Sequence, residues 1–238
     1  MEPNSSQNTR KTGRVFIIFM LFLLLMLPIL WVMFLKQGKH YAKRLPIYFE
    51  RYADEHGDTQ YHTIDDFSFI NQLGRPISSE DLEGKIWVVN FFFATCPDVC
   101  PQMNKNMQYI YREFIKEEDV VFLSHTVNPE HDTPEVLYEY SRQFGAEAPK
   151  WNFLTGSKSL IYDMAEFSYR VPGSEDAAHG GFFHSENIVL VDKDRRVRGI
   201  FHGLKGMHKE GNPKIIDAIR ALIFEYKQEQ GETESNEN

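Results

Sequence analysis

Apolar residues are concentrated in one continuous segment near the start of the chain. From Val15 to Leu35 the sequence contains no charged residue, and about 20 apolar residues are enough for a helix to span a bilayer. A cleavable signal peptide would have a shorter apolar region of about 7–15 residues followed by small residues, whereas Lys36-Gln37-Gly38-Lys39 follows here. Pro28 is tolerated in membrane helices. We therefore predict a single transmembrane anchor over residues 15–35.

Beyond this segment, the chain alternates between short apolar runs and helical patterns. Ile86–Phe93 is almost continuously apolar, as expected for a strand buried on both faces. Residues 98–117 carry apolar side chains at the spacing of one helix face, and Val120–Val127 resembles a second buried strand. The remaining predicted elements are a helix from an N-cap at Thr133 to Phe144, a strand at Trp151–Leu154, a helix at 158–167, a hairpin of Asn187–Val191 and Val197–Phe201, and a final helix at 213–228.

These elements define the organisation of the chain. Strands that alternate with helices favour a parallel sheet, and the terminal hairpin adds an antiparallel part. The order β-α-β-α-β-α-β-β-α predicts an α/β, thioredoxin-like fold, in which helices flank a mixed sheet and one helix is inserted. The predicted parts are a polar tail at 1–14, the anchor at 15–35, a stalk at 36–60, the thioredoxin-like domain at 61–228 and a disordered tail at 229–238.

Charge is distributed unevenly along the chain. Residues 1–44 carry seven Lys/Arg and one acid, whereas the remainder carries 19 Lys/Arg and 33 Asp/Glu. So acidic a domain excludes nucleic acid as a partner, because affinity for nucleic acid comes from neutralising phosphates. The negative charge either keeps the domain soluble or attracts a basic docking partner. Three basic residues before the anchor and four after it leave its orientation undecided.

The chain has two cysteines, Cys96 and Cys100, which follow the predicted strand 86–93 and open the predicted helix. A helix N-terminus carries partial positive charge, which stabilises a thiolate and lowers the pKa of a cysteine placed there. A spacing of four residues puts both sulfurs on one helix face, with Cα atoms about 6 Å apart, which suits a reversible disulfide or a shared metal ion. A static disulfide across so short a loop would add little stability.

Two thiolates make an incomplete metal site. Thiolates select Cu(I), whereas imidazole suits Cu(II) and zinc, so a protein that holds both copper states needs sulfur and histidine. Of the nine histidines, His184 is the best placed, because it lies just before the strand Asn187–Val191. In a thioredoxin-like fold the loop before that strand lies beside the helix that carries the cysteines. On the residues alone, a surface or core role for His184 stays open.

Three motifs resemble those of a known family. Thr95–Pro101, which reads TCPDVCP, is similar to the signature of the Sco/SenC family of copper chaperones for cytochrome oxidase assembly. Asn128–Pro134, NPEHDTP, resembles the second motif of that family, and Phe183-His184-Ser185 resembles its histidine motif. The resemblance covers about residues 60–227, with the motifs in the family's order.

This resemblance implies a thioredoxin fold that binds one copper ion, as Cu(I) or Cu(II). The implied metal ligands are Cys96, Cys100 and His184. The implied partners are a copper-receiving oxidase subunit, with CuA as the expected copper centre, and a copper donor protein. Residues 1–14 are short, polar and contain Glu2, unlike a mitochondrial presequence. We therefore expect a single-pass protein of a bacterial inner membrane, and the cysteine chemistry places the soluble domain on the periplasmic side.

The sequence departs from the family pattern at three positions. Thr95 stands where many members have His, and Asn128 stands where Asp is usual. Phe183 stands where many members have Asp, so the imidazole of His184 lacks a carboxylate neighbour that could orient it. None of these departures removes an implied ligand.

The cysteine pair also suits a thiol-disulfide reductase that keeps the oxidase cysteines reduced, since it offers a thiolate and a resolving thiol. Redox thioredoxins use C-x-x-C, one residue shorter, and this difference favours copper. A peroxidase-like enzyme and a redox or copper sensor are further hypotheses. Asp98, between the cysteines, could tune the thiolates. Met103 and Met107 could bind Cu(I), but methionines at this spacing are more typical of a core. Three further histidines could recruit copper loosely, namely His179, His202 and His208.

Overall fold

The computed structural model describes residues 19–31, 44–49, 51–53, 57, 59–171, 173–176, 182–204 and 213–236, with backbone alone at 51–52, 174–176, 182–184 and 230–236. The chain divides into two compact units, Met1–Lys43 and Arg44–Asn238. In the first unit a helix spans residues 19–31. Within the described residues, no helix is both long and apolar enough to cross a membrane. Residues 15–18 and 32–35 of the predicted anchor lie outside the described part.

The second unit is built around a mixed sheet of seven strands in the order β11-β10-β5-β6-β7-β3-β4. The central strands β5, β6 and β7 are parallel, and the other pairs are antiparallel, which confirms the predicted parallel centre and terminal hairpin. The strands of this sheet are β3 (Ser68–Asn71), β4 (Pro76–Ser78), β5 (Ile86–Phe92), β6 (Val120–Thr126), β7 (Trp151–Thr155), β10 (Asn187–Val191) and β11 (Val197–His202).

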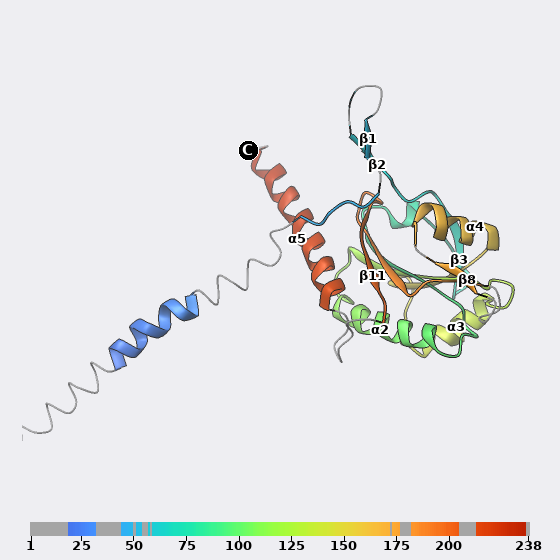
Figure 1. Ribbon diagram of the computed structural model, residues 1–238, viewed down its shortest axis with the longest axis horizontal. Coiled ribbons are helices and arrows are strands. Elements are labelled where there is room, and N and C mark those ends of the chain that lie inside the picture. Colours follow the sequence, from blue (N-terminus) through green and yellow to red (C-terminus); the bar gives the residue numbers. More distant parts are fainter. Residues whose placement is uncertain are drawn as a thin grey trace, which may run out of the picture. The chain divides into compact units, whose positions relative to one another are not determined.

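Helices cover both faces of this sheet (Figure 1). Side chains alternate between the two faces along a strand, so Asn90 and Phe92 of β5 face α2 and α3, whereas Phe91 faces Tyr169 on the other side. Every residue of β5, β6 and β7 is buried, which explains why most of their side chains are apolar. The helices are α2 (Val99–Glu113), α3 (Pro134–Arg142), α4 (Lys158–Asp163), which continues into a π-helical turn at Met164–Ser168, and α5 (Pro213–Asn236), with a short 3-10 turn at Glu80–Leu82.

Several boundaries differ from the predictions. The helix α5 continues to Asn236, past the predicted end at 228, because Glu, Gln and Lys favour helices and no proline stops it. The strands β3 and β4 were not predicted, because they are short and mix polar with apolar residues. Two small hairpins were also not predicted, one of β1 (Arg51–Ala53) with β2 (Thr59–Tyr61) and one of β8 (Ser174–Asp176) with β9 (Phe182–His184).

Part of the predicted stalk belongs to the folded unit. Leu45 and Phe49 pack against the core, and the Tyr48 backbone N–H donates to the Val197 carbonyl at 2.8 Å. The guanidinium of Arg198, on β11, donates to the carbonyl oxygens of Leu45 and Pro46 at 2.7 and 3.2 Å. Residues 45–49 of the predicted stalk, which pack and form hydrogen bonds in this way, therefore belong to the folded unit.

Candidate functional site

The two cysteines lie where β5 passes into α2. Cys96 belongs to the loop after β5, and the helix begins at Val99, so the prediction that both sulfurs lie on one helix face is wrong for Cys96. They are nevertheless in contact, since the Cys100 backbone N–H donates to the Cys96 sulfur at 3.4 Å. The N-terminus of α2 therefore does direct a free N–H at a cysteine sulfur. Both cysteines are buried and neither forms a disulfide.

Burial opposes ionisation at the second cysteine. Loss of solvent raises the pKa of the Cys100 thiol, the neighbouring Cys96 and Asp132 raise it further, and a hydrogen bond with the Phe93 backbone acts in the opposite direction. The prediction of a lowered pKa is therefore wrong for Cys100, because desolvation outweighs the helix N-terminus. A ligand that needs the thiolate must displace this proton.

Asp132, from the NPEHDTP motif, forms a hydrogen bond with the loop that carries Cys96. Its carboxylate is fully buried and accepts hydrogen bonds from the Ala94 backbone N–H at 2.9 Å and from the Thr126 hydroxyl. The other carboxylate oxygen contacts His131 Nδ1 at 2.7 Å. Thr133 then caps α3, as predicted, by accepting from the Val136 N–H. The second motif thus connects the end of β6 to the loop that carries Cys96.

Replacing Asp132 with asparagine is expected to lower the free energy of unfolding by about 1 kcal/mol, because two charge-assisted hydrogen bonds become neutral ones. Urea unfolding followed by tryptophan fluorescence measures this change, since Trp87 and Trp151 are buried. The matched control is Asp65→Asn at an exposed position. Equal stability of the two variants would show that the Asp132 carboxylate does not hold the loop.

His184 is the last residue of β9, and its backbone pairs with Ser174 of β8. Its side chain lies outside the described part of the structure. The chain that follows is held against α2. The Glu186 carbonyl accepts from the Gly203 N–H, and the Gly203 carbonyl accepts from Asn106 Nδ2 at 2.6 Å. A Cβ at Gly203 would come within 2.9 Å of Met103, one turn beyond Cys100. The chain two residues after His184 therefore lies close to α2, the helix that begins beside Cys100.

The other residues considered for the metal site lie in different environments. Met103 and Met107 are fully buried core residues. Asp98 is exposed and accepts from Gln102 Nε2 at 2.7 Å, and His202 Nε2 contacts the Glu186 carboxylate at 3.0 Å. Among the described side chains, no three His, Cys, Asp or Glu residues come together as a metal-binding group, a search that does not include the His184 side chain. His179 and His208 lie outside the described residues.

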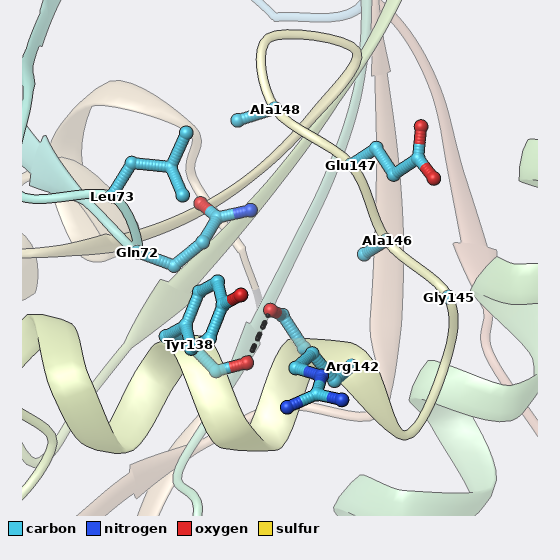
Figure 2. A pocket seen from close by; sticks show the side chains of 9 residues that line it. Gln72, Leu73, Tyr138, Arg142, Gly145, Ala146, Glu147 and Ala148 are labelled. Carbon is cyan, nitrogen blue, oxygen red and sulfur yellow. Dashed lines mark hydrogen bonds between the residues drawn. The ribbon is translucent and has the colours of Figure 1, made fainter.

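Two surface cavities lie away from the cysteines. The larger, of about 470 Å³, is lined by Leu73, Tyr138 and Arg142 among others (Figure 2). The smaller, of about 430 Å³, shares Leu73 and Tyr138. Neither is lined by a cysteine, so both are separate from the candidate site.

Comparison with known proteins gives a consistent result. A family model described as SCO1/SenC matches residues 55–223. The SCO1 protein homolog of Bacillus subtilis is 29% identical over 150 residues, which cover 62% of this chain and 78% of that protein. A solved SCO1/SenC family lipoprotein from Bacillus anthracis has a TM-score of 0.60 and 29% identity, and the match covers 68% of this chain and 95% of that one.

A second solved structure contains a metal ion. It is ScoI of Bradyrhizobium japonicum with copper bound, with a TM-score of 0.54 and 27% identity over 67% of this chain and 99% of that one. The family model spans well over half of the sequence and includes all three motifs. From its sequence and its thioredoxin-like architecture, this chain is a member of the SCO1/SenC family.

Proposed function

We propose that this protein is a membrane-anchored copper chaperone. It binds one copper ion as cargo and delivers it to the copper centre, CuA, of a respiratory cytochrome oxidase. The proposed ligands are Cys96, Cys100 and His184. The observation that carries the proposal is the pair of reduced cysteines in contact at the start of α2, in a family that includes a copper-bound relative.

The donor set suits copper that changes oxidation state. Two sulfurs are soft ligands for Cu(I), and an imidazole adds a ligand that Cu(II) accepts. Because burial raises the pKa of Cys100, copper binding must release the proton of that thiol. Copper affinity should therefore increase with pH, and local acidity at a docked partner would favour release.

We place the chain in a bacterial inner membrane as a single-pass protein. Residues 15–35 form the anchor, and the folded unit lies on the periplasmic side. This placement is supported by the length of the uncharged apolar run and by the need to meet an oxidase subunit and a copper donor protein outside the cytoplasm.

A thiol-disulfide reductase is the second candidate function. It is supported by the contact between Cys100 N–H and the Cys96 sulfur, which brings an attacking and a resolving thiol together. A relative of 28% identity, BsSco, is described as having a disulfide switch. Copper delivery remains the preferred function, because the pair is one residue wider than a redox C-x-x-C.

An anaerobic Cu(I) and Cu(II) titration of the reduced full-length chain in detergent tests the proposal. We expect one copper ion per chain and a thiolate-to-Cu(II) charge-transfer band. Cys96→Ser should abolish the band, and His184→Ala should weaken binding at least about tenfold. The control is His62→Ala, which removes a histidine bonded to the Ser168 carbonyl. Rapid reduction of a disulfide substrate without stoichiometric copper would assign the protein to the reductases instead.

A further inference from the structure

The histidine of the NPEHDTP motif is held by a buried carboxylate. His131 Nδ1 lies 2.7 Å from Asp132 Oδ1, and the Asp132 side chain is fully buried, whereas that of His131 is 50% exposed. The other carboxylate oxygen, Oδ2, accepts from the Ala94 N–H at 2.9 Å and from the Thr126 hydroxyl. A carboxylate that accepts all of its hydrogen bonds requires the His131 proton to lie on Nδ1.

This bond determines what the second ring nitrogen of His131 offers. In a neutral imidazole with its proton on Nδ1, Nε2 carries a lone pair. Among the described residues Nε2 has no hydrogen-bond partner, and the half-exposed ring leaves it accessible. Histidines that bind metals almost always donate their other N–H to a carboxylate, a carbonyl or water, which orients the ring and makes the ligating nitrogen more basic. His131 has this arrangement.

The loop that carries His131 runs beside the loop that carries the first cysteine. The two loops follow β5 and β6, which are parallel neighbours in register up to their last residues. They therefore leave the sheet at the same edge, where the carboxyl ends of strands form binding crevices in α/β folds. Asp132 joins them, because it contacts His131 and also bonds the backbone two residues before Cys96. Its charge also acts on the nearby Cys100, whose pKa it raises.

The two cysteines are poorly accessible to arriving copper, since Cys96 is 6% and Cys100 4% exposed. We propose that His131 Nε2 is an entry ligand, which captures copper at the surface and passes it to the cysteine pair. His131 is not a resident ligand, because among the described side chains it belongs to no group of three metal-binding residues. In the transfer the copper–nitrogen bond breaks as copper–sulfur bonds form, the thiol protons leave to water, and the oxidation state of copper is unchanged. This inference rests on the proposed function and adds the route by which copper reaches its site.

The test is the rate at which the reduced full-length chain in detergent takes Cu(I) from its bicinchoninate complex under anaerobic conditions. In His131→Asn the side-chain amide still offers an N–H to Asp132, but the ligating Nε2 is absent. We expect copper uptake to become about ten times slower, while the amount of copper bound at equilibrium stays the same. His62→Asn is the matched control, because this part-buried histidine bonds the Ser168 carbonyl, and its uptake rate should equal that of the wild type.

An unchanged uptake rate in His131→Asn would overturn the proposal. Slow uptake in His131→Ala alone would also overturn it, because His131 would then act only by holding Asp132. A second measurement does not depend on the cysteines. In a chain that carries both Cys96→Ser and Cys100→Ser, substoichiometric Cu(II) should broaden the NMR signals of the His131 ring before those of the His62 ring, and equal broadening would refute the entry ligand. A wild type that bound no copper at equilibrium would refute the chaperone function, while this broadening would still decide whether His131 captures copper.

Discussion

In a chain that carries Arg198→Met, the free energy of unfolding is expected to fall by about 3 kcal/mol, the lower end of the cost of removing one partner from a buried ion pair. The Arg198 side chain is 2% exposed and bonds Asp192, which is fully buried, at 2.9 Å. The same guanidinium contacts the Glu225 carboxylate of α5 at 2.9 Å. Methionine preserves the apolar stem and removes the charge, so Asp192 would keep Arg196 as its remaining cationic partner among the described residues.

The same substitution should release the segment that leads into the folded unit. Arg198 supplies the hydrogen bonds to the carbonyls of Leu45 and Pro46, and Tyr48 N–H bonds the neighbouring Val197 carbonyl. Amide hydrogen exchange at Tyr48 should therefore become at least about tenfold faster. Urea unfolding of full-length protein in detergent gives the stability change.

Arg220→Met is the control for this prediction. Arg220 pairs with Glu113 on the surface, where their side chains are 42% and 44% exposed. Surface pairs contribute about 0–1 kcal/mol, so this variant should unfold nearly as the wild type does. If both variants lost the same small amount of stability, the buried cluster around Asp192 would not be what holds the entering segment.

The central elements were predictable because their physics is local. A strand buried on both faces must be mostly apolar, and β5 and the first four residues of β6 are, apart from Asn90. The start of α3 at its N-cap Thr133 follows from equally local rules. The strands β3 and β4 are stabilised by pairing with each other and with β7, which a pattern of three or four mixed residues does not reveal.

The candidate site was predictable in its residues but not in its environment. The spacing of Cys96 and Cys100 indicates a chemical role, but the sequence does not reveal that both are buried or that Asp132, far along the chain, bonds the loop before Cys96. Asn90 and Ser124 read as polar exceptions in apolar strands, because their partners lie on other elements. A charged residue such as Arg198 on a terminal hairpin is typical of a solvent-facing position. In the structure it is buried and bonds the Leu45 carbonyl of a segment far along the sequence.

A buried histidine makes the fold sensitive to acid. His125 lies on β6 among Phe67, Phe69, Phe91 and Tyr169, and its Nδ1 is buried without a hydrogen-bond partner among the described residues. Burial lowers the pKa of His125 from 6.5 to about 3. The folded state therefore keeps this ring neutral at a pH where the unfolded chain takes up a proton. The contribution of His125 to the free energy of unfolding is therefore fully present above pH 6.5, and it is lost progressively as the pH falls from 6.5 toward 3.

His125→Phe is expected to remove this dependence. Between pH 7 and pH 5 the free energy of unfolding of the wild type should fall by about 2 kcal/mol more than that of the variant. The difference arises mainly below pH 6.5, where the contribution of His125 falls by about 1.4 kcal/mol per pH unit. At pH 7 the two stabilities should be similar, because the variant no longer buries the unpaired Nδ1 but takes a weak partner, Nε2 at 3.5 Å, from the Tyr169 hydroxyl. Urea unfolding at the two pH values measures both effects.

Phe91→Leu tests whether packing alone could produce the same result. Phe91 stacks on His125 at 5.2 Å but has no ionisable group, so its replacement should cost the same free energy at pH 7 and pH 5. If the free energy of unfolding changed with pH equally in the wild type and in His125→Phe, the imidazole would have to gain its proton in the folded state. The aromatic cluster would then have to open to water on acidification, and tryptophan fluorescence from Trp87, whose ring contacts Phe67 at 5.9 Å, would report that opening.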